Sequence, residues 1–147
     1  MDTVDAKTRS KIMARVKGKD TKPELFVRKA LYEKGYRYRL HYKKLPGHPD
    51  LVFPKYKAAI FIHGCFWHRH GCYKSTTPST RVDYWLNKFE ENVERDKRQI
   101  EQILALGWRV MIIWECVIKG KTKFDSDDIV VAITKWLKSS ERFSTLG

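Results

Sequence analysis

Apolar residues recur at helical spacing in three parts of the chain. The first part follows Thr21-Lys22-Pro23-Glu24, which matches a capping box with proline in the first turn, and it stops at Gly35. A longer and highly charged part covers 81–106 and is closed by a glycine, and a third covers 126–138 with Ser126 as a candidate cap. These patterns predict three amphipathic helices.

Other stretches of the chain are typical of strands. Residues 36–43 alternate between apolar and basic side chains, which is the period of a strand with one apolar face. The apolar runs 50–53 and 58–62 are separated by the short turn 54–57 and predict a hairpin, and 108–114 predicts a further strand. The expected order of elements is αβββαβα, an α/β arrangement of the α+β kind with a mixed sheet.

The chain is expected to form a single domain over residues 1–147, because it shows no internal repeat, low-complexity tract or linker. Residues 7–19 form a basic segment with three apolar side chains at helical spacing and predict an N-terminal arm. The last residues, 139–147, carry no clear pattern and are expected to be a flexible tail.

Charge narrows the possible partners. Lys and Arg number 30 against 17 Asp and Glu, a formal net charge of +13, which favours nucleic acid as partner and an anionic membrane surface second. No stretch reaches the roughly 18 apolar residues that a membrane span needs, and the polar first residues do not resemble a signal peptide. We therefore expect a cytoplasmic, nucleoid-associated protein without a membrane partner.

The nine residues 64–72 carry two thiols and two imidazoles. Zn²⁺ binds such ligands tetrahedrally, so Cys65, His70 and Cys72 offer three ligands, and Cys116, just past the strand 108–114, could supply the fourth. A closed site of this kind would be structural. The alternative is a set of buried or free thiols in a loop.

Asp50 lies at the start of a predicted strand, directly after the turn-rich segment 45–49. Hard cations such as Mg²⁺ take oxygen ligands of this kind. Pairing within the hairpin would bring the end of its second strand, with Ile62 and His63, beside Asp50. The alternative interpretation makes Asp50 a turn residue only.

Several side chains near this loop could take part in catalysis or contact a nucleic acid. His63 and His68 are not needed for zinc and could accept a proton from water at neutral pH, although surface hydrogen bonding is the simpler alternative. Phe66 and Trp67, in a loop that zinc would stiffen, could wedge between bases, and core packing is the alternative for them. Trp85 could do so as well, but core packing is a strong alternative for it.

The residues together resemble the very short patch repair (Vsr) family of DNA mismatch endonucleases from about Lys7 to Lys119. The segments that carry the resemblance are KTRSKIMARV, LPGHPDLVF, FIHGCFWHRHGC, ENVERDKRQI and LGWRVMIIWEC. The resemblance implies a restriction-endonuclease-like fold related to the PD-(D/E)xK nucleases, with Phe61-Ile62-His63 in place of the usual second acidic residue and lysine.

The resemblance also implies roles for individual residues. Asp50 would bind Mg²⁺ together with the carbonyl of Ile62, and one or two ions are expected. His68 would activate the attacking water, while His63 and Glu24 would hold water around the metal. Glu24 is also explained by its capping-box position alone, and Asp96 matches in a supporting role.

For the remaining site residues, the family's zinc ligands fall on Cys65, His70, Cys72 and Cys116, the set already reached from coordination chemistry. Its intercalating residues fall on Phe66, Trp67 and Trp85. The reaction implied is Mg²⁺-dependent nicking of one strand of duplex DNA, 5′ to the thymine of a T:G mismatch left by deamination of 5-methylcytosine. A monomer is expected, and mismatch-repair proteins are conceivable partners.

Two other functions fit the same residues. One is another nuclease of this fold with a different DNA substrate, which would keep the chemistry of Asp50 and use the aromatic side chains differently. The other is a non-catalytic, zinc-stabilised nucleic-acid-binding protein. The positive charge, the aromatic side chains and the Cys/His loop, residues 64–72, would suffice for this function.

Overall fold

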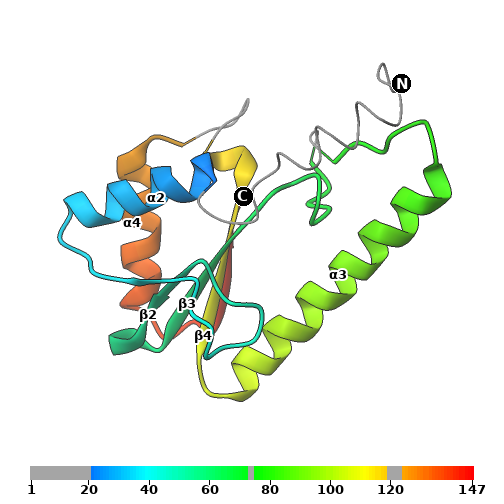
Figure 1. Cartoon of the computed structure of the whole chain (residues 1–147). Coiled ribbons are helices and arrows are strands. Elements are labelled where there is room, and N and C mark those ends of the chain that lie inside the picture. The colour runs from blue at the N-terminus through cyan, green and yellow to red at the C-terminus, as the bar shows by residue number, and fades with distance from the viewer. Residues whose placement is uncertain (1–20, 73–74, 119–123) are drawn as a thin grey trace.

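A five-stranded mixed sheet with helices on both faces organises the chain (Figure 1). The computed structural model describes residues 21–72, 75–118 and 124–147, and the predicted arm 7–19 lies outside them. The helices are α2 (Lys22–Glu33), α3 (Val82–Ala105) and α4 (Ser126–Leu137). The strands are β1 (Arg39–Leu40), β2 (Leu51–Phe53), β3 (Ala58–His63), β4 (Arg109–Trp114) and β5 (Phe143–Leu146), and short 3₁₀ turns cover Pro54–Tyr56 and Glu115–Val117.

The strands lie in their sequence order, β1-β2-β3-β4-β5. β2 and β3, joined by the short turn 54–57, pair antiparallel, and β1 pairs antiparallel with β2 across the longer segment 41–50. β4 lies parallel to β3, in register from Ala58 opposite Arg109 to His63 opposite Trp114. Because the two strands run in the same direction, their carboxyl ends meet at one edge of the sheet, and α3 is the crossover between them.

Successive side chains of the central strands point to opposite faces of the sheet and pack into two separate cores. Ile60 and Ile113 point to the face covered by α2 and α4, whereas Phe61 and Ile112 point to the face on which Ile103 of α3 packs. The strands β2, β3 and β4 are buried on both faces, which explains why they are almost continuously apolar. In Figure 1, α2 and α4 lie together on one side, and α3 extends away on the other.

The three predicted helices are confirmed, with one correction at a terminus. The N-cap of α4 is Asp125 rather than Ser126. Asp125 accepts a hydrogen bond from the Asp128 N–H at 2.8 Å, and the Asp128 carboxylate accepts one from the Asp125 N–H at 3.4 Å. The sequence interpretation missed this reciprocal cap because aspartate replaces both the usual serine or threonine and the usual glutamate. None of the helices in the described ranges has the length and apolar character to cross a membrane.

The strand predicted for 36–43 is much shorter than expected. Only Arg39 and Leu40 pair with β2, because His41 takes a left-handed backbone conformation, with φ 46°, that ends the ladder. The aromatic side chains of the predicted apolar face nevertheless pack against the core. The rings of Tyr36 and Tyr38 pack edge-on against Phe53, with centroids 6.3 and 6.2 Å away.

The prediction of a flexible tail over 139–147 is wrong. Residues 143–146 form β5, which lies parallel to β4 from Val110 opposite Phe143 to Ile113 opposite Leu146. The segment Phe-Ser-Thr-Leu is too short and polar to be recognised alone, and it becomes a strand because the edge of β4 offers it backbone partners.

Arg109 fastens the end of the chain to the body of the protein. Its guanidinium donates to carbonyl oxygens on both sides of the turn that follows α4 and lies 4.8 Å from the centre of the Trp136 ring. The accepting carbonyls, at 2.8–3.4 Å, belong to Tyr56, Trp136, Leu137, Ser139 and Glu141. A planar fork with five N–H groups suits this cluster of acceptors.

Arg109→Lys should lower the free energy of unfolding by about 2 kcal/mol, because an ammonium group reaches fewer of these carbonyls and leaves the others unpaired. Urea denaturation measures the change. Arg98→Lys, on the exposed surface of α3, is the matched control and should be close to neutral. A loss below 0.5 kcal/mol at Arg109, taken as roughly the noise level for surface substitutions, would contradict this account.

Candidate active site

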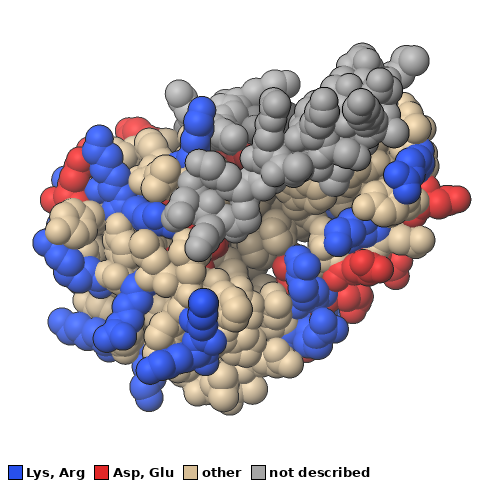
Figure 2. All heavy atoms as spheres, in the orientation of Figure 1, with Lys and Arg blue, Asp and Glu red and all other residues tan. Residues whose placement is uncertain are grey.

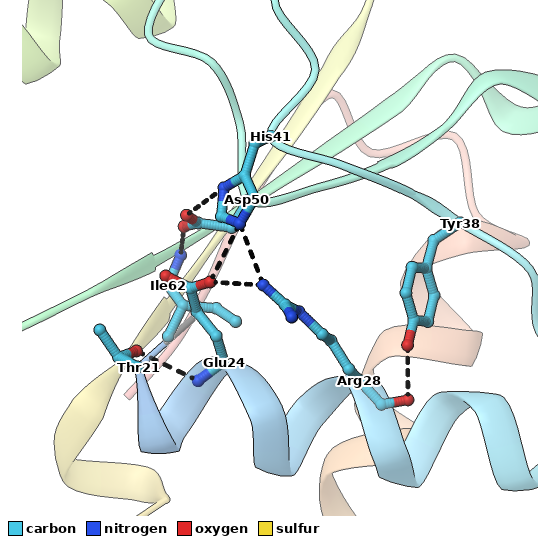
Figure 3. A network of polar contacts seen from close by, with 7 residues as sticks. All are labelled: Thr21, Glu24, Arg28, Tyr38, His41, Asp50 and Ile62. Atoms are coloured by element: carbon cyan, nitrogen blue, oxygen red, sulfur yellow. Dashed lines mark hydrogen bonds and ion pairs between the residues drawn. The ribbon is translucent and has the colours of Figure 1, made fainter. Parts of the chain in front are cut away.

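Asp50 immediately precedes β2 and lies beside the carboxyl end of β3, as the hairpin pattern predicts. Its carboxylate oxygen Oδ2 accepts a hydrogen bond of 2.7 Å from the backbone N–H of Ile62. This bond joins the two ends of the hairpin (Figure 3). The position of Asp50 is therefore set by the pairing of β2 with β3.

A second carboxylate reaches the same place from α2. The side chain of Glu24 is buried, with a residue exposure of 3%. Thr21 caps the helix by accepting a hydrogen bond from the Glu24 N–H at 3.4 Å, while the Glu24 carboxylate points toward Asp50 and Arg28 (Figure 3). The backbone of Glu24 thus belongs to the helix cap, while its side chain faces the site.

His41 is a further member of this cluster that sequence reasoning missed. Its Nδ1 lies 3.9 Å from Asp50 Oδ1, and its Nε2 lies 3.6 Å from Glu24 Oε2. Each of the three side chains has a ligand-type atom within 4.8 Å of the others. In the sequence, His41 looked like one more basic residue on the polar face of a strand. Its left-handed backbone conformation gave no recognisable signal.

The two carboxylates of this cluster repel each other when both are charged. The pKa of Asp50 is raised to about 7, chiefly by burial and further by the neighbouring Glu24, while the N–H of Ile62 and the charge of Arg28 oppose the rise. A bound divalent cation would stabilise both carboxylates in their charged form. The donor set of carboxylate oxygens therefore fits a hard metal ion such as Mg²⁺.

His63, His68 and Asp96 form a second cluster at the carboxyl end of β3. The rings of His63 and His68 stack with centroids 3.9 Å apart and planes 6° from parallel. Nδ1 of His68 lies 2.5 Å from Oδ2 of Asp96, which projects from α3. When the Asp96 carboxylate accepts a hydrogen bond from Nδ1–H of neutral His68, Nε2 of this ring has a lone pair that can accept a proton.

The two histidines differ in their surroundings. His63 is 6% exposed, and its pKa is lowered to about 3, first by burial and then by the neighbouring His68. His63 is therefore neutral at physiological pH. A cavity of about 470 Å³, lined largely by apolar side chains of α3 and β4, opens beside His63, His68 and Asp96, so a water molecule can approach this cluster.

The structure brings the four predicted zinc ligands together. Nδ1 of His70 lies 3.6 Å from the sulfur of Cys65 and 3.5 Å from that of Cys116. The potential ligand atoms of these three residues and Cys72 all lie within 4.8 Å of one another. Cys65 follows β3 and Cys116 follows β4, so the parallel pairing of these strands closes the long sequence gap between them.

The chemistry of this set fits a zinc ion. All three cysteines are free of disulfides. The pKa of Cys65 is raised to about 12, mainly by burial and secondarily by the neighbouring thiols. A bound cation would favour the thiolates that zinc requires. Three sulfurs and one imidazole nitrogen match a closed tetrahedral site.

The three predicted intercalating side chains also lie together. The rings of Phe66 and Trp67 have centroids 5.1 Å apart, and each lies 5.9 Å from Trp85. Phe66 and Trp67 are half-buried, whereas Trp85 is 3% exposed and packs on Phe89. In this structure Trp85 is therefore part of the packing that supports the other two rings.

Arg69 and Asn92 hold this aromatic loop and carried no recognisable signal in the sequence. Arg69 donates to the carbonyls of Ser75 and Thr76 and lies 4.0 Å from the centre of the Phe89 ring. Asn92, buried on α3, donates to the carbonyl of Trp67 at 3.1 Å. The loop is consequently fixed to α3 by hydrogen bonds as well as by ring packing.

Basic side chains extend well beyond these clusters. Figure 2 shows Lys and Arg gathered on the left and lower parts of the visible face, where α2 and the first strands lie in Figure 1. A surface of this kind attracts the phosphates of a nucleic acid.

Several known proteins are similar in sequence to this chain. A family model described as "DNA mismatch endonuclease Vsr" matches residues 1–74. The chain is 41% identical to DNA mismatch endonuclease Vsr of Escherichia coli K12 over 136 residues, which cover 92% of this chain and 87% of that protein.

Two similar proteins are described as nicking enzymes. Type II nicking enzyme V.XorIIP of Xanthomonas oryzae pv. oryzae is 47% identical over 115 residues, covering 78% of this chain and 85% of the relative. Type II nicking enzyme V.NmeAIP of Neisseria meningitidis is 42% identical over 120 residues, covering 82% and 86%. With half of its length matched by the family model and 41% identity along most of a mismatch endonuclease, this chain belongs to the Vsr family and is a DNA endonuclease.

Proposed function

We propose that this protein nicks one strand of duplex DNA, with Mg²⁺ as cofactor, 5′ to the thymine of a T:G mismatch that arises when 5-methylcytosine deaminates. The cut would initiate very short patch repair. The observation that carries the proposal is the placement of two carboxylates, Asp50 and Glu24, and an Asp96-oriented histidine at one end of β2 and β3. The similarity to a DNA mismatch endonuclease supports it.

The carboxylate cluster would hold the metal. Asp50 would bind Mg²⁺ directly, the carbonyl of Ile62 would be a further ligand, and Glu24 would hold water around the ion. When bound, one or two Mg²⁺ ions would polarise the scissile phosphate and stabilise charge on the leaving oxygen. We also propose that the fold is restriction-endonuclease-like and forms a single domain.

The cluster of His63, His68 and Asp96 would accept a proton from the attacking water. Nε2 of His68 takes a proton from the attacking water, and Asp96 stabilises the imidazolium that forms. The water oxygen bonds to phosphorus while the bond from phosphorus to the 3′ oxygen breaks, which leaves 5′-phosphate and 3′-hydroxyl ends. His63 is neutral beside His68 and helps to hold water in the site.

Phe66, Trp67 and Trp85 would read the mismatch by inserting between base pairs. Unstacking costs a few kcal/mol per base step and is cheapest at a weakened pair, so selectivity can arise from deformation of the DNA. Trp85 is covered in the structure without DNA, so this role requires it to become exposed on binding. The zinc held by Cys65, His70, Cys72 and Cys116 would keep the loop in place.

The remaining proposals concern the setting of the reaction. The basic arm 7–19 would lie against the duplex and contact phosphates. We expect a monomer that works at the nucleoid in the cytoplasm, with mismatch-repair proteins as further partners.

Of the alternatives, a nuclease of the same fold with another DNA substrate is favoured by one observation, the similarity to type II nicking enzymes. The non-catalytic binder is set aside, because the family is one of endonucleases.

The proposed substrate is tested with labelled duplexes that differ only in having T:G or C:G at one position, in several flanking sequences, with and without Mg²⁺. Cutting is expected only at T:G, only on the thymine strand and only with Mg²⁺. Asp50→Ala should retain DNA binding and lose nicking. Equal cutting of both duplexes would instead support the nuclease of broader substrate range.

Asp50→Asn should stabilise the protein at pH 7.5 without added Mg²⁺, by about 2 kcal/mol, because it removes a buried charge next to Glu24 and still accepts the Ile62 hydrogen bond. The folded-state pKa of Asp50 is raised, so its contribution to stability is fully present below about pH 4 and is lost as the pH rises through about 7. The gain should therefore shrink toward pH 4.

Urea denaturation across this pH range measures the effect, and Glu90→Gln, on an exposed part of α3, is the neutral control. Added Mg²⁺ should stabilise the wild type and not Asp50→Asn. A wild type that is more stable than Asp50→Asn at every pH would show that the carboxylate is not destabilising.

Cys65→Ser should lose one equivalent of zinc and at least about 3 kcal/mol of stability, because a hydroxyl is a poor zinc ligand and the loop loses its fixed point. Atomic absorption and thermal unfolding measure the two losses. A strong chelator should produce the same change in the wild type and little further change in Cys65→Ser. A variant that releases zinc without loss of stability would rule out a structural role.

A further inference from the structure

Arg28 and His41 connect the two carboxylates of the proposed metal site (Figure 3). Nη2 of Arg28 lies 2.9 Å from Glu24 Oε2 and 3.0 Å from His41 Nε2. The other ring nitrogen of His41, Nδ1, faces Oδ1 of Asp50 at 3.9 Å. A continuous polar path therefore runs from Glu24 through Arg28 and His41 to Asp50.

The direction of each contact follows from what the groups can donate. A guanidinium has N–H donors and no acceptor, so Nε2 of His41 must accept the hydrogen bond from Arg28. The ring proton of His41 then sits on Nδ1, the nitrogen that faces Asp50. One oxygen of Asp50 thus faces this N–H, while the other accepts the N–H of Ile62.

Both members of this pair are held in place by their own surroundings. The hydroxyl of Tyr38 donates to the Arg28 carbonyl at 3.0 Å, which fastens this turn of α2 to the segment before β1. The backbone N–H of His41 donates to the Asp50 carbonyl at 3.2 Å. His41 is held with φ 46°, a conformation uncommon for residues other than glycine that often marks functional sites.

His41 is poorly suited to bind the metal itself, although its ring nitrogens lie close enough to the carboxylates. Its Nε2 lone pair accepts from Arg28, and its Nδ1 carries the proton. The positive charge of Arg28 contacts Glu24 and favours the charged form of Asp50, which offsets part of the repulsion between the two carboxylates. The pair therefore supports the ligands and does not replace them.

We propose that Arg28 and His41 are positioning residues that hold Glu24 and Asp50 in the orientation in which they take up a divalent cation. The inference rests on the proposed function, because it assumes that Asp50 binds metal. Partners of this kind orient metal ligands, and their loss typically weakens metal binding about 10- to 100-fold.

The test is Mn²⁺ binding without DNA, measured by the electron paramagnetic resonance signal of free Mn²⁺ in titrations of the wild type, His41→Gly and His41→Gln. Asp50→Asn gives the baseline for ions bound elsewhere. His41→Gly should bind Mn²⁺ at least about tenfold more weakly. His41→Gln should stay within about threefold of the wild type, because its amide can both accept from Arg28 and donate to Asp50.

Unfolding without Mn²⁺ separates positioning from folding. His41→Gly should keep its stability, since glycine adopts the left-handed conformation without strain. Arg28→Lys should weaken Mn²⁺ binding, because the shorter lysine side chain cannot place its nitrogen where Nη2 contacts both Glu24 and His41. Arg37→Lys at an exposed position should leave binding unchanged.

Two results would overturn the inference while leaving the proposed function intact. Wild-type affinity in His41→Gly would show that the contact has no role. Equal weakening in His41→Gly and His41→Gln would show that the imidazole itself is a ligand. A wild type that binds no more Mn²⁺ than Asp50→Asn would instead overturn the proposed metal site together with this inference.

Discussion

The pairing of β3 with a strand on each side brings the candidate side chains of the strands and of the loops that follow them to one end of the sheet. β2 pairs antiparallel with β3, so Asp50, which immediately precedes β2, lies beside the end of β3. β4 meets β3 parallel, so His63 and Trp114 end at the same edge. These strands are buried on both faces, and a shift in register would move apolar side chains from one core to the other. The hydrophobic core thus fixes the geometry of a polar site.

The two carboxylates of this site lie close together although their negative charges repel each other. Glu24 and Asp50 are brought together with little access to water, which raises the pKa of Asp50. Arg28 and the N–H of Ile62 offset part of the repulsion. An arrangement that costs stability without a cation and gains it with one is expected where binding and catalysis require concentrated charge.

The Cys/His loop joins the same sheet edge to α3. Cys65 and Cys116 extend from the ends of adjacent parallel strands, and the loop between β3 and α3 also carries His68, Phe66 and Trp67. Asp96 and Asn92, both on α3, contact this loop through His68 and the carbonyl of Trp67. The proposed proton acceptor and the proposed wedge therefore share one support, so a change in the loop should affect both.

The sequence by itself determined the features that depend on near neighbours along the chain. The helices were predictable from the spacing of their apolar residues, the β2–β3 hairpin from two apolar runs, and Cys65, His70 and Cys72 from their density in one loop. The resemblance to a family of endonucleases rested on equally local motifs. Each of these signals lies within a few residues, where backbone preference and side-chain chemistry suffice to give it.

Only the tertiary structure decided the features that depend on distant segments. β5 exists because the edge of β4 offers a partner to a segment with little strand character of its own. His41 joins Glu24 and Asp50 because a left-handed residue ends β1 beside α2. Asp96 contacts His68 because the packing of α3 against the sheet places this residue beside the loop that follows β3. These contacts follow from strand register and helix packing, which the whole core determines and no local stretch of sequence encodes.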